Sequence, residues 1–136
     1  MTHIAILSNP DRAKELRRTP RPSLEDDRRK TWRAHAVALL GIEEGGRLLA
    51  MLGYRMTFSL CWGKSLYVDD LVVAPDLRLG GYGRPLLDAA KAIARGAHCD
   101  HISLCNGLTR VAAHRFFKTS GLPGFSKQFV LPLKGF

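Results

Sequence analysis

The segment Arg78–Gly83, with the sequence Arg-Leu-Gly-Gly-Tyr-Gly, constrains the fold more than any other part of the chain. It lies between an apolar run, Leu66–Ala74, and a segment with helical periodicity, Arg84–Ala94. Glycines let an anionic ligand approach the backbone closely, and N–H groups at the start of a helix point toward such a ligand. The order strand, glycine-rich turn, helix therefore predicts a site for a phosphate group.

The spacing of the glycines excludes two common kinds of phosphate site. No Gly-Lys-Ser/Thr closes the turn, so the segment is not a P-loop. Gly81 and Gly83 are followed by Pro85 and Leu86, so the third glycine of a dinucleotide-binding fingerprint is missing. Taken alone, the remaining Gly-x-Gly is explained equally well by a structural turn, and its neighbours must decide.

Length and cysteine content indicate the class of protein. A chain of 136 residues predicts a single domain, spanning residues 1–136. No apolar run approaches the roughly 20 residues that a membrane-spanning helix needs, and the first residues do not resemble a secretory signal. The three cysteines, Cys61, Cys99 and Cys105, form no Cys-x-x-Cys pair. These features predict a cytoplasmic protein without a membrane segment.

The chain is basic, with 21 Lys and Arg against 12 Asp and Glu, a net charge of +9. Residues 1–34 hold nine basic and five acidic residues (+4), and the remainder holds twelve and seven (+5). Because the excess is spread out and forms no basic tail, it favours an anionic cofactor on a basic surface over nucleic acid.

The pattern along the chain predicts an α+β fold with the order β-α-α-β-β-β-α-β-α-β. We expect a mixed, mostly antiparallel sheet of about six or seven strands with helices on both faces. The strand before the glycine turn and the strand after its helix should be parallel neighbours, joined right-handedly. The expected strands are His3–Leu7, Ala36–Ile42, Arg47–Phe58, Leu66–Val73, His101–Cys105 and Gln128–Leu133, and the expected helices are Asp11–Arg18, Ser23–Arg33, Arg84–Ala94 and one capped by Thr109 and ended by Gly121.

Three segments in this order resemble the GNAT family of N-acetyltransferases. They are the strand Tyr67–Val73, the turn Arg78–Gly83, which fits the family's Gln/Arg-x-x-Gly-x-Gly/Ala, and Ala113–Leu122, which is similar to its Ala-x-x-Phe-Tyr-x-x-x-Gly-Phe. The resemblance covers residues 65–122, and the preceding hairpin agrees in order and length. Gly63–Val72 and Gly107–Phe116 are also similar to one bacterial branch of small uncharacterised acetyltransferases.

The resemblance implies acetyl-CoA as co-substrate and places it on this chain. The pyrophosphate would rest on backbone N–H groups of the glycine turn, and the pantetheine arm would pair with the edge of the preceding strand. A β-bulge near Val68–Asp70 would open the sheet there, and the N–H of Leu71 or Val73 would polarise the acetyl carbonyl. The implied cofactor residues are Leu71, Val72, Val73, Arg78, Leu79, Gly80, Gly81, Tyr82, Gly83, Arg84 and Asn106; no metal site is predicted.

The implied reaction is direct attack of a primary amine on the thioester, which needs a base for the amine proton. Asp69 and Asp70 are the candidates. Side chains alternate along a strand, so only one of them should face the cleft, and Asp69 is slightly favoured. The alternative is that both carboxylates are solvated or paired with nearby arginines.

The leaving thiolate has no obvious proton donor. Phe117 stands where the family usually has a Tyr, so the thiolate leaves unassisted or receives help from His114, Ser120 or Tyr82. His114 is also explained as an ordinary surface or capping histidine. The bacterial branch has Asp-Ser-Gly where this chain has Cys105-Asn106-Gly107. Cys105 fits a small buried hydrophobe better than a covalent nucleophile.

The leading interpretation is an acetyl-CoA-dependent N-acetyltransferase acting on a small-molecule or peptide amine. Phe117 and Cys105 suggest an alternative, a catalytically silent acyl-CoA-binding module. The charge of +9 suggests another, a toxin-like acetyltransferase acting on charged tRNA. A homodimer is expected by analogy with the family. The residues do not identify the acceptor amine.

Overall fold

The fold is that of a computed structural model of residues 1–136. Two compact units, Met1–Leu104 and Cys105–Phe136, make up the chain, and each is described by itself. The first contains a five-stranded sheet and helix α2, and the second contains helix α3. The structure describes residues 3–8, 12, 15–16, 38–77, 80–105, 111–124 and 128–133, with the backbone alone at 111–112.

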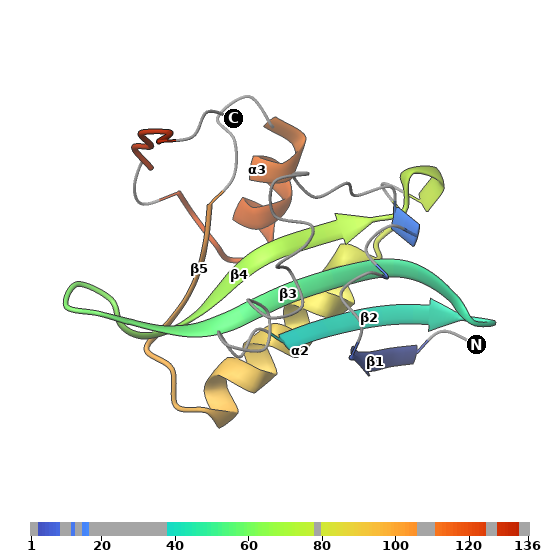
Figure 1. The fold of residues 1–136 in the computed structure, drawn as a ribbon, viewed down its shortest axis with the longest axis horizontal. Coiled ribbons are helices and arrows are strands. Elements are labelled where there is room, and N and C mark those ends of the chain that lie inside the picture. The colour runs from blue at the N-terminus through green and yellow to red at the C-terminus, as the bar shows by residue number, and fades with distance from the viewer. Residues whose placement is uncertain are drawn as a thin grey trace. The chain divides into compact units, whose positions relative to one another are not determined.

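The sheet has the strand order β1-β2-β3-β4-β5 (Figure 1). Neighbours among the first four strands are antiparallel, whereas β5 runs parallel to β4. The predicted parallel pairing across the glycine turn and its helix is therefore confirmed. The strands are β1 His3–Leu7, β2 Ala38–Glu44, β3 Arg47–Ser59, β4 Gly63–Val73 and β5 His101–Leu104.

The turn between β2 and β3 follows from two glycines. Gly45 and Gly46 have φ values of 57° and 80°, both in the left-handed region. A two-residue turn of this kind matches the right-handed twist of the strands that it joins, and glycine adopts it without a steric cost. This is the hairpin predicted from the sequence.

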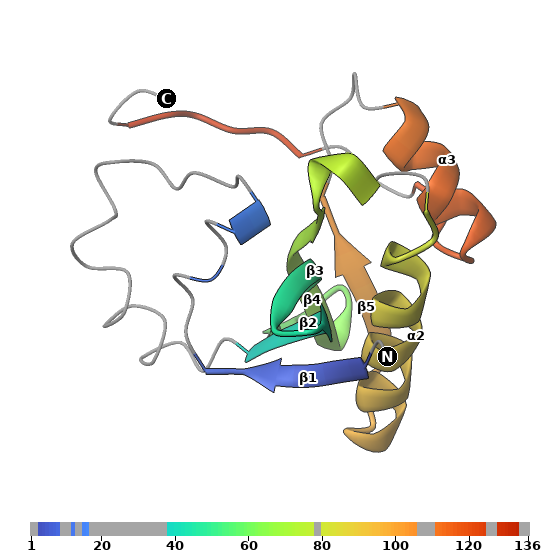
Figure 2. The same cartoon turned by 90° about the vertical axis from the view of Figure 1, so that its right-hand side faces the viewer.

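Helix α2, Gly83–Gly96, covers one face of the sheet (Figure 2). Leu86, Ala90 and Ala94 form its apolar stripe and are buried against the sheet. Pro85 lies in the first turn of the helix, where its missing N–H costs nothing. The sheet residues of this core are Leu40, Ile42, Leu49, Ala50, Leu52, Leu66 and Val68.

A smaller core lies on the opposite face of the sheet. Leu16, in a short helical turn, is 1% exposed and packs there against Leu7, Leu39, Leu48 and Met51. In Figure 2 this turn lies on the side of the sheet away from α2. Because β3 is covered on both faces, it reads as an unbroken apolar run over residues 48–52 rather than as an alternation.

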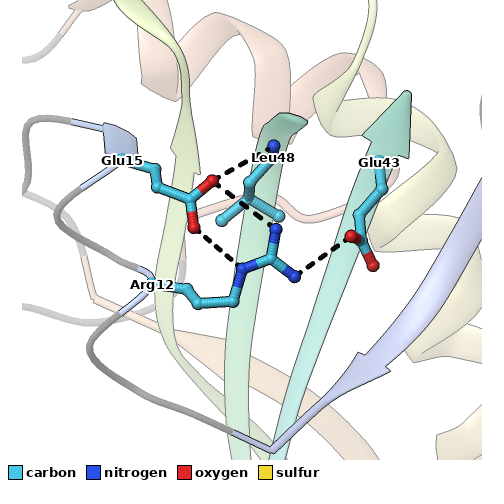
Figure 3. A network of polar contacts seen from close by, with 4 residues as sticks. All are labelled: Arg12, Glu15, Glu43 and Leu48. Atoms are coloured by element: carbon cyan, nitrogen blue, oxygen red, sulfur yellow. Dashed lines mark hydrogen bonds and ion pairs between the residues drawn. The ribbon is translucent and has the colours of Figure 1, made fainter. Parts of the chain in front are cut away.

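A polar network attaches the turn around Leu16 to the sheet (Figure 3). Arg12 donates from Nε to Glu15 at 2.8 Å and from Nη1 to Glu43 at 3.1 Å, and the Leu48 N–H donates to Glu15 at 3.4 Å. The hydrogen bond from Arg12 holds the pKa of Glu15 below its usual value. Glu43 on β2 thus binds the N-terminal segment through Arg12.

Helix α3, Val111–Thr119, ends as predicted at Gly121. Gly121 has a φ of 93°, its N–H donates to the Lys118 carbonyl, and the Leu122 N–H donates to the Phe117 carbonyl at 2.8 Å. This pair of bonds is a Schellman motif, which satisfies carbonyls at the helix end. The predicted cap, Thr109, lies outside the described residues.

The prediction of a strand at Gln128–Leu133 is wrong. Residues 128–133 belong to no strand, and Phe129, Leu131 and Leu133 are 80–90% exposed. An alternating apolar pattern makes a strand only where a neighbouring strand completes its hydrogen bonds, and the pattern itself does not specify that neighbour. The described part of the sheet accordingly has five strands rather than six or seven.

Most of the two predicted N-terminal helices, Asp11–Arg18 and Ser23–Arg33, falls outside the described residues. Among the helices that are described, none combines the length and apolar character needed to cross a membrane.

The two-sided core predicts the stability of leucine variants. Leu52 is fully buried between the sheet and α2, so Leu52→Ala should lower the free energy of unfolding by about 2–5 kcal/mol. Leu60→Ala, at a fully exposed position of the β3–β4 turn, should change it by less than about 0.5 kcal/mol. Urea denaturation measures both variants, and equal losses would contradict this description of the core.

Candidate active site on strand β4

A β-bulge interrupts the ladder between β3 and β4. Gly53 pairs with Asp70 and Tyr54 pairs with Val68, so Asp69 is an extra residue with no partner of its own on β3. The bulge predicted near Val68–Asp70 is therefore confirmed. A bulge of this kind bends its strand and redirects the side chains next to it.

The bulge places both aspartates on the face of the sheet away from α2. Asp70 lies opposite Gly53, and a Cβ at Gly53 would lie 3.9 Å from Asp70 Oδ2 and 3.3 Å from Leu39, which belongs to the core on that face. Arg55, two residues along β3 and thus on the same face, donates from Nε to Asp69 Oδ1 at 3.1 Å. The expectation that alternation would separate Asp69 from Asp70 is wrong, because the extra residue suspends the alternation.

Asp69 has the electrostatics of a carboxylate partly removed from water. Its side chain is 27% exposed. Burial raises its pKa above the usual value, the hydrogen bond and charge of Arg55 oppose that rise, and the neighbouring charge of Asp70 adds to it. The net effect is a raised pKa, which makes Asp69 a stronger base than an exposed aspartate.

The ladder between β4 and β5 ends beside the bulge. Within the described residues, β5 pairs with β4 only from Ser65 to Val68, where Leu104 is its last residue. Beyond this point the edge of β4 is not continued by β5. Within the described residues, the β4–β5 ladder thus ends next to Asp69, where the family resemblance predicts that the sheet opens.

The backbone groups that face this opening follow from the ladder with β3. The Ala74 N–H donates to the Leu49 carbonyl at 2.9 Å, so Ala74 points toward β3. Alternate residues of an antiparallel strand point the same way, so Val72 also points toward β3. The N–H groups of Leu71 and Val73 therefore point to the opposite edge, where β5 has ended.

The glycine turn follows β4 after a 3-10 turn, Pro75–Leu77. The Gly80 N–H donates to the Leu77 carbonyl at 3.1 Å, and a Cβ at Gly80 would lie only 2.9 Å from that oxygen. Gly81 has a φ of 81°, a left-handed conformation that disfavours other residues. Both positions thus require glycine for the turn itself. Arg78 and Leu79 lie outside the described residues.

The start of α2 is open to an anion. The N-cap residue, Tyr82, makes no side-chain capping hydrogen bond, and the first turn has no acidic residue. The N–H groups of that turn carry the positive end of the helix dipole, which favours a negative ligand. Arg84 lies at this end too, with its Nε 3.3 Å from Asp88 Oδ1.

The remaining predicted residues belong to the second unit. His114 and Phe117 lie on α3, where the Phe117 ring packs edge-on against Phe116 with centroids 5.3 Å apart. Asn106 lies outside the described residues. The structure thus brings Asp69 and Asp70 together, while the role of His114 stays a prediction.

The sequence allowed a pairing of the aspartates with nearby arginines, but it did not identify Arg55 as the partner of Asp69. The place of Arg55 opposite Tyr67 on β3 depends on the register, and its contact with Asp69 depends on the exact residue that bulges. A count of alternating residues in the β3–β4 hairpin could have placed Arg55 near this part of β4. The sequence alone offers no signal that fixes the bulge at Asp69 rather than at a neighbour.

A cavity of about 370 Å³ lies beside the end of β4. It is lined by Glu15, Ala74 and Pro75 and by an ion pair in which Arg47 Nη2 lies 2.8 Å from both oxygens of Asp76. Polar and apolar groups both line the cavity, and the predicted site residues that the structure describes are not among them.

The bulge, the opened strand edge and the glycine turn agree with the comparison of the chain with known protein families. The model of the acetyltransferase (GNAT) family matches residues 5–122. The chain belongs to this family. Apart from the first two residues of β1, the match spans the five described strands and helices α2 and α3.

Relatives of this GNAT chain agree with the assignment. An uncharacterised N-acetyltransferase, YhdJ of Bacillus subtilis, is 38% identical over 79 residues, which are 58% of this chain and 56% of that protein. The match thus spans just over half of that relative.

Solved structures show the same fold. Glucosamine-6-phosphate N-acetyltransferase from Arabidopsis thaliana has a TM-score of 0.77 and 19% identity, covering 98% of this chain and 99% of its own. The aminoglycoside N-acetyltransferase AAC(6')-Iy, crystallised in complex with CoA, has a TM-score of 0.77 and 12% identity, covering 97% and 99%.

Alanine variants of Gly81 in the turn and of Gly96 at the end of α2 should have opposite effects on stability. Gly81→Ala should destabilise the protein by about 1–2 kcal/mol, because alanine is strained at a φ of 81°. Gly96→Ala, in the last position of α2 with no atom within 4 Å of the new Cβ, should stabilise it by about 0.5 kcal/mol. Thermal denaturation compares them, and a neutral Gly81→Ala would refute the strained turn.

Proposed function

We propose that this protein is an acetyl-CoA-dependent N-acetyltransferase that transfers an acetyl group to a primary amine. The observation that carries the proposal is the bulge at Asp69, which coincides with the end of the β4–β5 ladder. One distortion thereby supplies an open strand edge for an acyl carrier and a carboxylate beside it. Residues 1–136 act in this proposal as one acetyltransferase domain.

The proposed cofactor site follows the direction of the chain from β4 into α2. The pantetheine arm, which carries amide groups, pairs with the edge of Leu71–Val73. The pyrophosphate lies against the N–H groups from Gly81 to Arg84, where the dipole of α2 favours its charge, while the Gly80 N–H shapes the turn by donating to the Leu77 carbonyl. The CoA complex of the structurally similar AAC(6')-Iy supports the same type of cofactor here. Arg78, Leu79 and Asn106 complete the proposed set.

The proposed reaction is a direct transfer. The neutral amine attacks the thioester carbonyl, an N–C bond forms, the C–S bond breaks, and CoA leaves as a thiolate. The N–H of Leu71 or Val73 donates to the carbonyl oxygen as negative charge develops on it. The attacking nitrogen becomes acidic as its new bond forms, and Asp69, directly or through a water, accepts its proton.

The pKa of Asp69 gives the reaction a predicted pH dependence. Because the base must be ionised, activity is present above the pKa of Asp69 and is lost as the pH falls through it. The raised pKa places this acid limb at a higher pH than an ordinary aspartate would give. Asp70, on the same face, increases the negative potential that attracts a cationic acceptor.

The acceptor is proposed to be a small-molecule or peptide amine. Two structural neighbours are named as N-acetyltransferases of glucosamine-6-phosphate and of aminoglycosides, which are both amines. We place the protein in the reducing cytoplasm, which suits the three free cysteines, Cys61, Cys99 and Cys105. A homodimer is proposed by analogy with the family.

Phe117 favours a second candidate, a silent acyl-CoA-binding module. A phenyl ring donates no proton to the leaving thiolate, and His114 on the same helix is the proposed substitute. The variant Phe117→Tyr separates the two functions. It should accelerate an active enzyme, and it should leave a silent module without turnover.

Two measurements test the proposed function. Isothermal titration should show acetyl-CoA binding, and no binding at millimolar acetyl-CoA would refute the site. Release of CoA thiol in the presence of a panel of primary amines should then show turnover. If acetyl-CoA binds but no amine of the panel causes release of CoA thiol, the protein is the silent module instead.

Substitution of the proposed base should separate chemistry from binding. Asp69→Asn keeps the shape of the side chain but removes the basic oxygen, so kcat should fall by about 100-fold or more. Asp70→Asn, the matched control, should lower kcat by less than about tenfold. The Kd for acetyl-CoA should be unchanged in both. A Kd that rises as steeply as kcat falls would assign Asp69 to cofactor binding.

A further inference from the structure

We propose that Arg55 is a positioning residue that fixes the orientation of Asp69 through a charged hydrogen bond from the neighbouring strand. The role of Asp69 as a base rests on the proposed function. The coupling between the Arg55 guanidinium and the Asp69 carboxylate does not depend on it, and it can be measured without substrate or cofactor.

The geometry of Arg55 is that of a clamp between two strands. On β3 it lies directly opposite Tyr67 of β4, and its guanidinium carbon lies 5.1 Å from the centre of the Tyr67 ring. Its Nε donates to Asp69 Oδ1 at 3.1 Å. The ring supports the guanidinium from one side while the carboxylate binds its edge, which restricts the rotamers that Arg55 can adopt.

Asp69 needs such a partner because it is the bulged residue. Its neighbours Val68 and Asp70 have partners on β3 that fix their directions, whereas Asp69 has none. Backbone pairing therefore does not set the direction of its side chain. The bond from Arg55 does so, and it engages Oδ1 and leaves Oδ2 for the proton of an amine or water.

Arg55 also lowers the pKa of Asp69 by its hydrogen bond and its positive charge. Among the described residues, the charged groups that act on Asp69 are Arg55 from β3 and Asp70 from its own strand. Burial and Asp70 both raise the pKa of Asp69, and Arg55 opposes them. The Arg55 guanidinium thus limits the rise in the pKa of Asp69, so this half-buried carboxylate stays ionised to a lower pH than it would without Arg55.

A purely structural ion pair would behave differently from a positioning pair. Exposed pairs contribute little to stability, and the Arg55 side chain is 43% exposed. The chain offers a matched control in the Arg47–Asp76 pair, which is closer at 2.8 Å, more exposed, and remote from the bulge. Loss of either pair should have a similarly small effect on folding, and only loss of Arg55 should affect Asp69.

The experiment compares Arg55→Gln, Arg55→Lys and Arg47→Gln with the unaltered chain. Carbon-13 NMR follows the titration of the Asp69 carboxyl, assigned from its loss in Asp69→Asn. In Arg55→Gln the pKa of Asp69 should rise, and the acid limb of kcat/KM should move to higher pH with it. At pH values on that limb, kcat/KM should fall by about tenfold while the KM for acetyl-CoA stays unchanged.

The two other variants separate the effect of charge from that of geometry and control for the loss of an unrelated ion pair. Arg55→Lys keeps the charge but loses the planar group that the Tyr67 ring supports, so it should restore the titration more fully than kcat. Arg47→Gln should leave both the titration of Asp69 and kcat unchanged.

An Asp69 titration that is identical in Arg55→Gln and in the unaltered chain would overturn the proposal. So would an equal displacement in Arg47→Gln. Failure of the proposed function looks different: the titration would respond to Arg55, but Asp69→Asn would transfer acetyl groups at the unaltered rate. The coupling would then stand, and Asp69 would lose its role as base.

Discussion

One extra residue in strand β4 determines the arrangement of the candidate active site. With Asp69 inserted, the ladder with β3 passes from Val68 to Asp70 without a partner for the residue between them. Three features coincide at the same place. The alternation of side chains is suspended, two carboxylates lie on one face, and the ladder with β5 ends at Val68. In the proposed function, the first two create the base and its surroundings, and the third creates the cofactor edge.

The rest of the first unit holds this distortion in place. β3 and β4 lie between the core under α2 and the smaller core around Leu16, and close packing on both faces leaves little room for a strand to shift. The Arg12, Glu15 and Glu43 network fastens the Leu16 turn to that second face. Beyond the bulge, β4 continues into the glycine turn and then into α2, whose N-cap residue makes no side-chain capping hydrogen bond. The proposed acyl and phosphate sites thus share one continuous backbone.

The sequence predicts the regular parts of this arrangement well, because their causes are local. The paired glycines of the β2–β3 turn and Gly121 at the end of α3 have the conformations expected of them. The parallel pairing of β4 with β5 follows from a strand, helix, strand order. The bulge was expected only through the family resemblance, since the residues around Asp69 carry no signal of it.

Features that depend on register or on distant partners were not predictable from the sequence. Arg55 reaches Asp69 only because the bulge falls at that residue, and the same shift places Asp70 on the same face. Leu16 and Arg12 join the sheet across more than 20 intervening residues, a contact that no local pattern specifies. Residues 128–133 have the composition of a strand, yet they lie in no ladder. In each case tertiary contacts decided what propensity left open.

The central claim is that the edge of β4 beyond the bulge binds acetyl-CoA, and amide NMR of nitrogen-15-labelled protein tests it most directly. Saturating acetyl-CoA should shift the amide signals of Leu71 and Val73, whose N–H groups point to the opened edge. It should shift that of Val72 much less, because Val72 points toward β3. The account would be contradicted if acetyl-CoA bound without shifting Leu71 and Val73, or shifted all three amides equally.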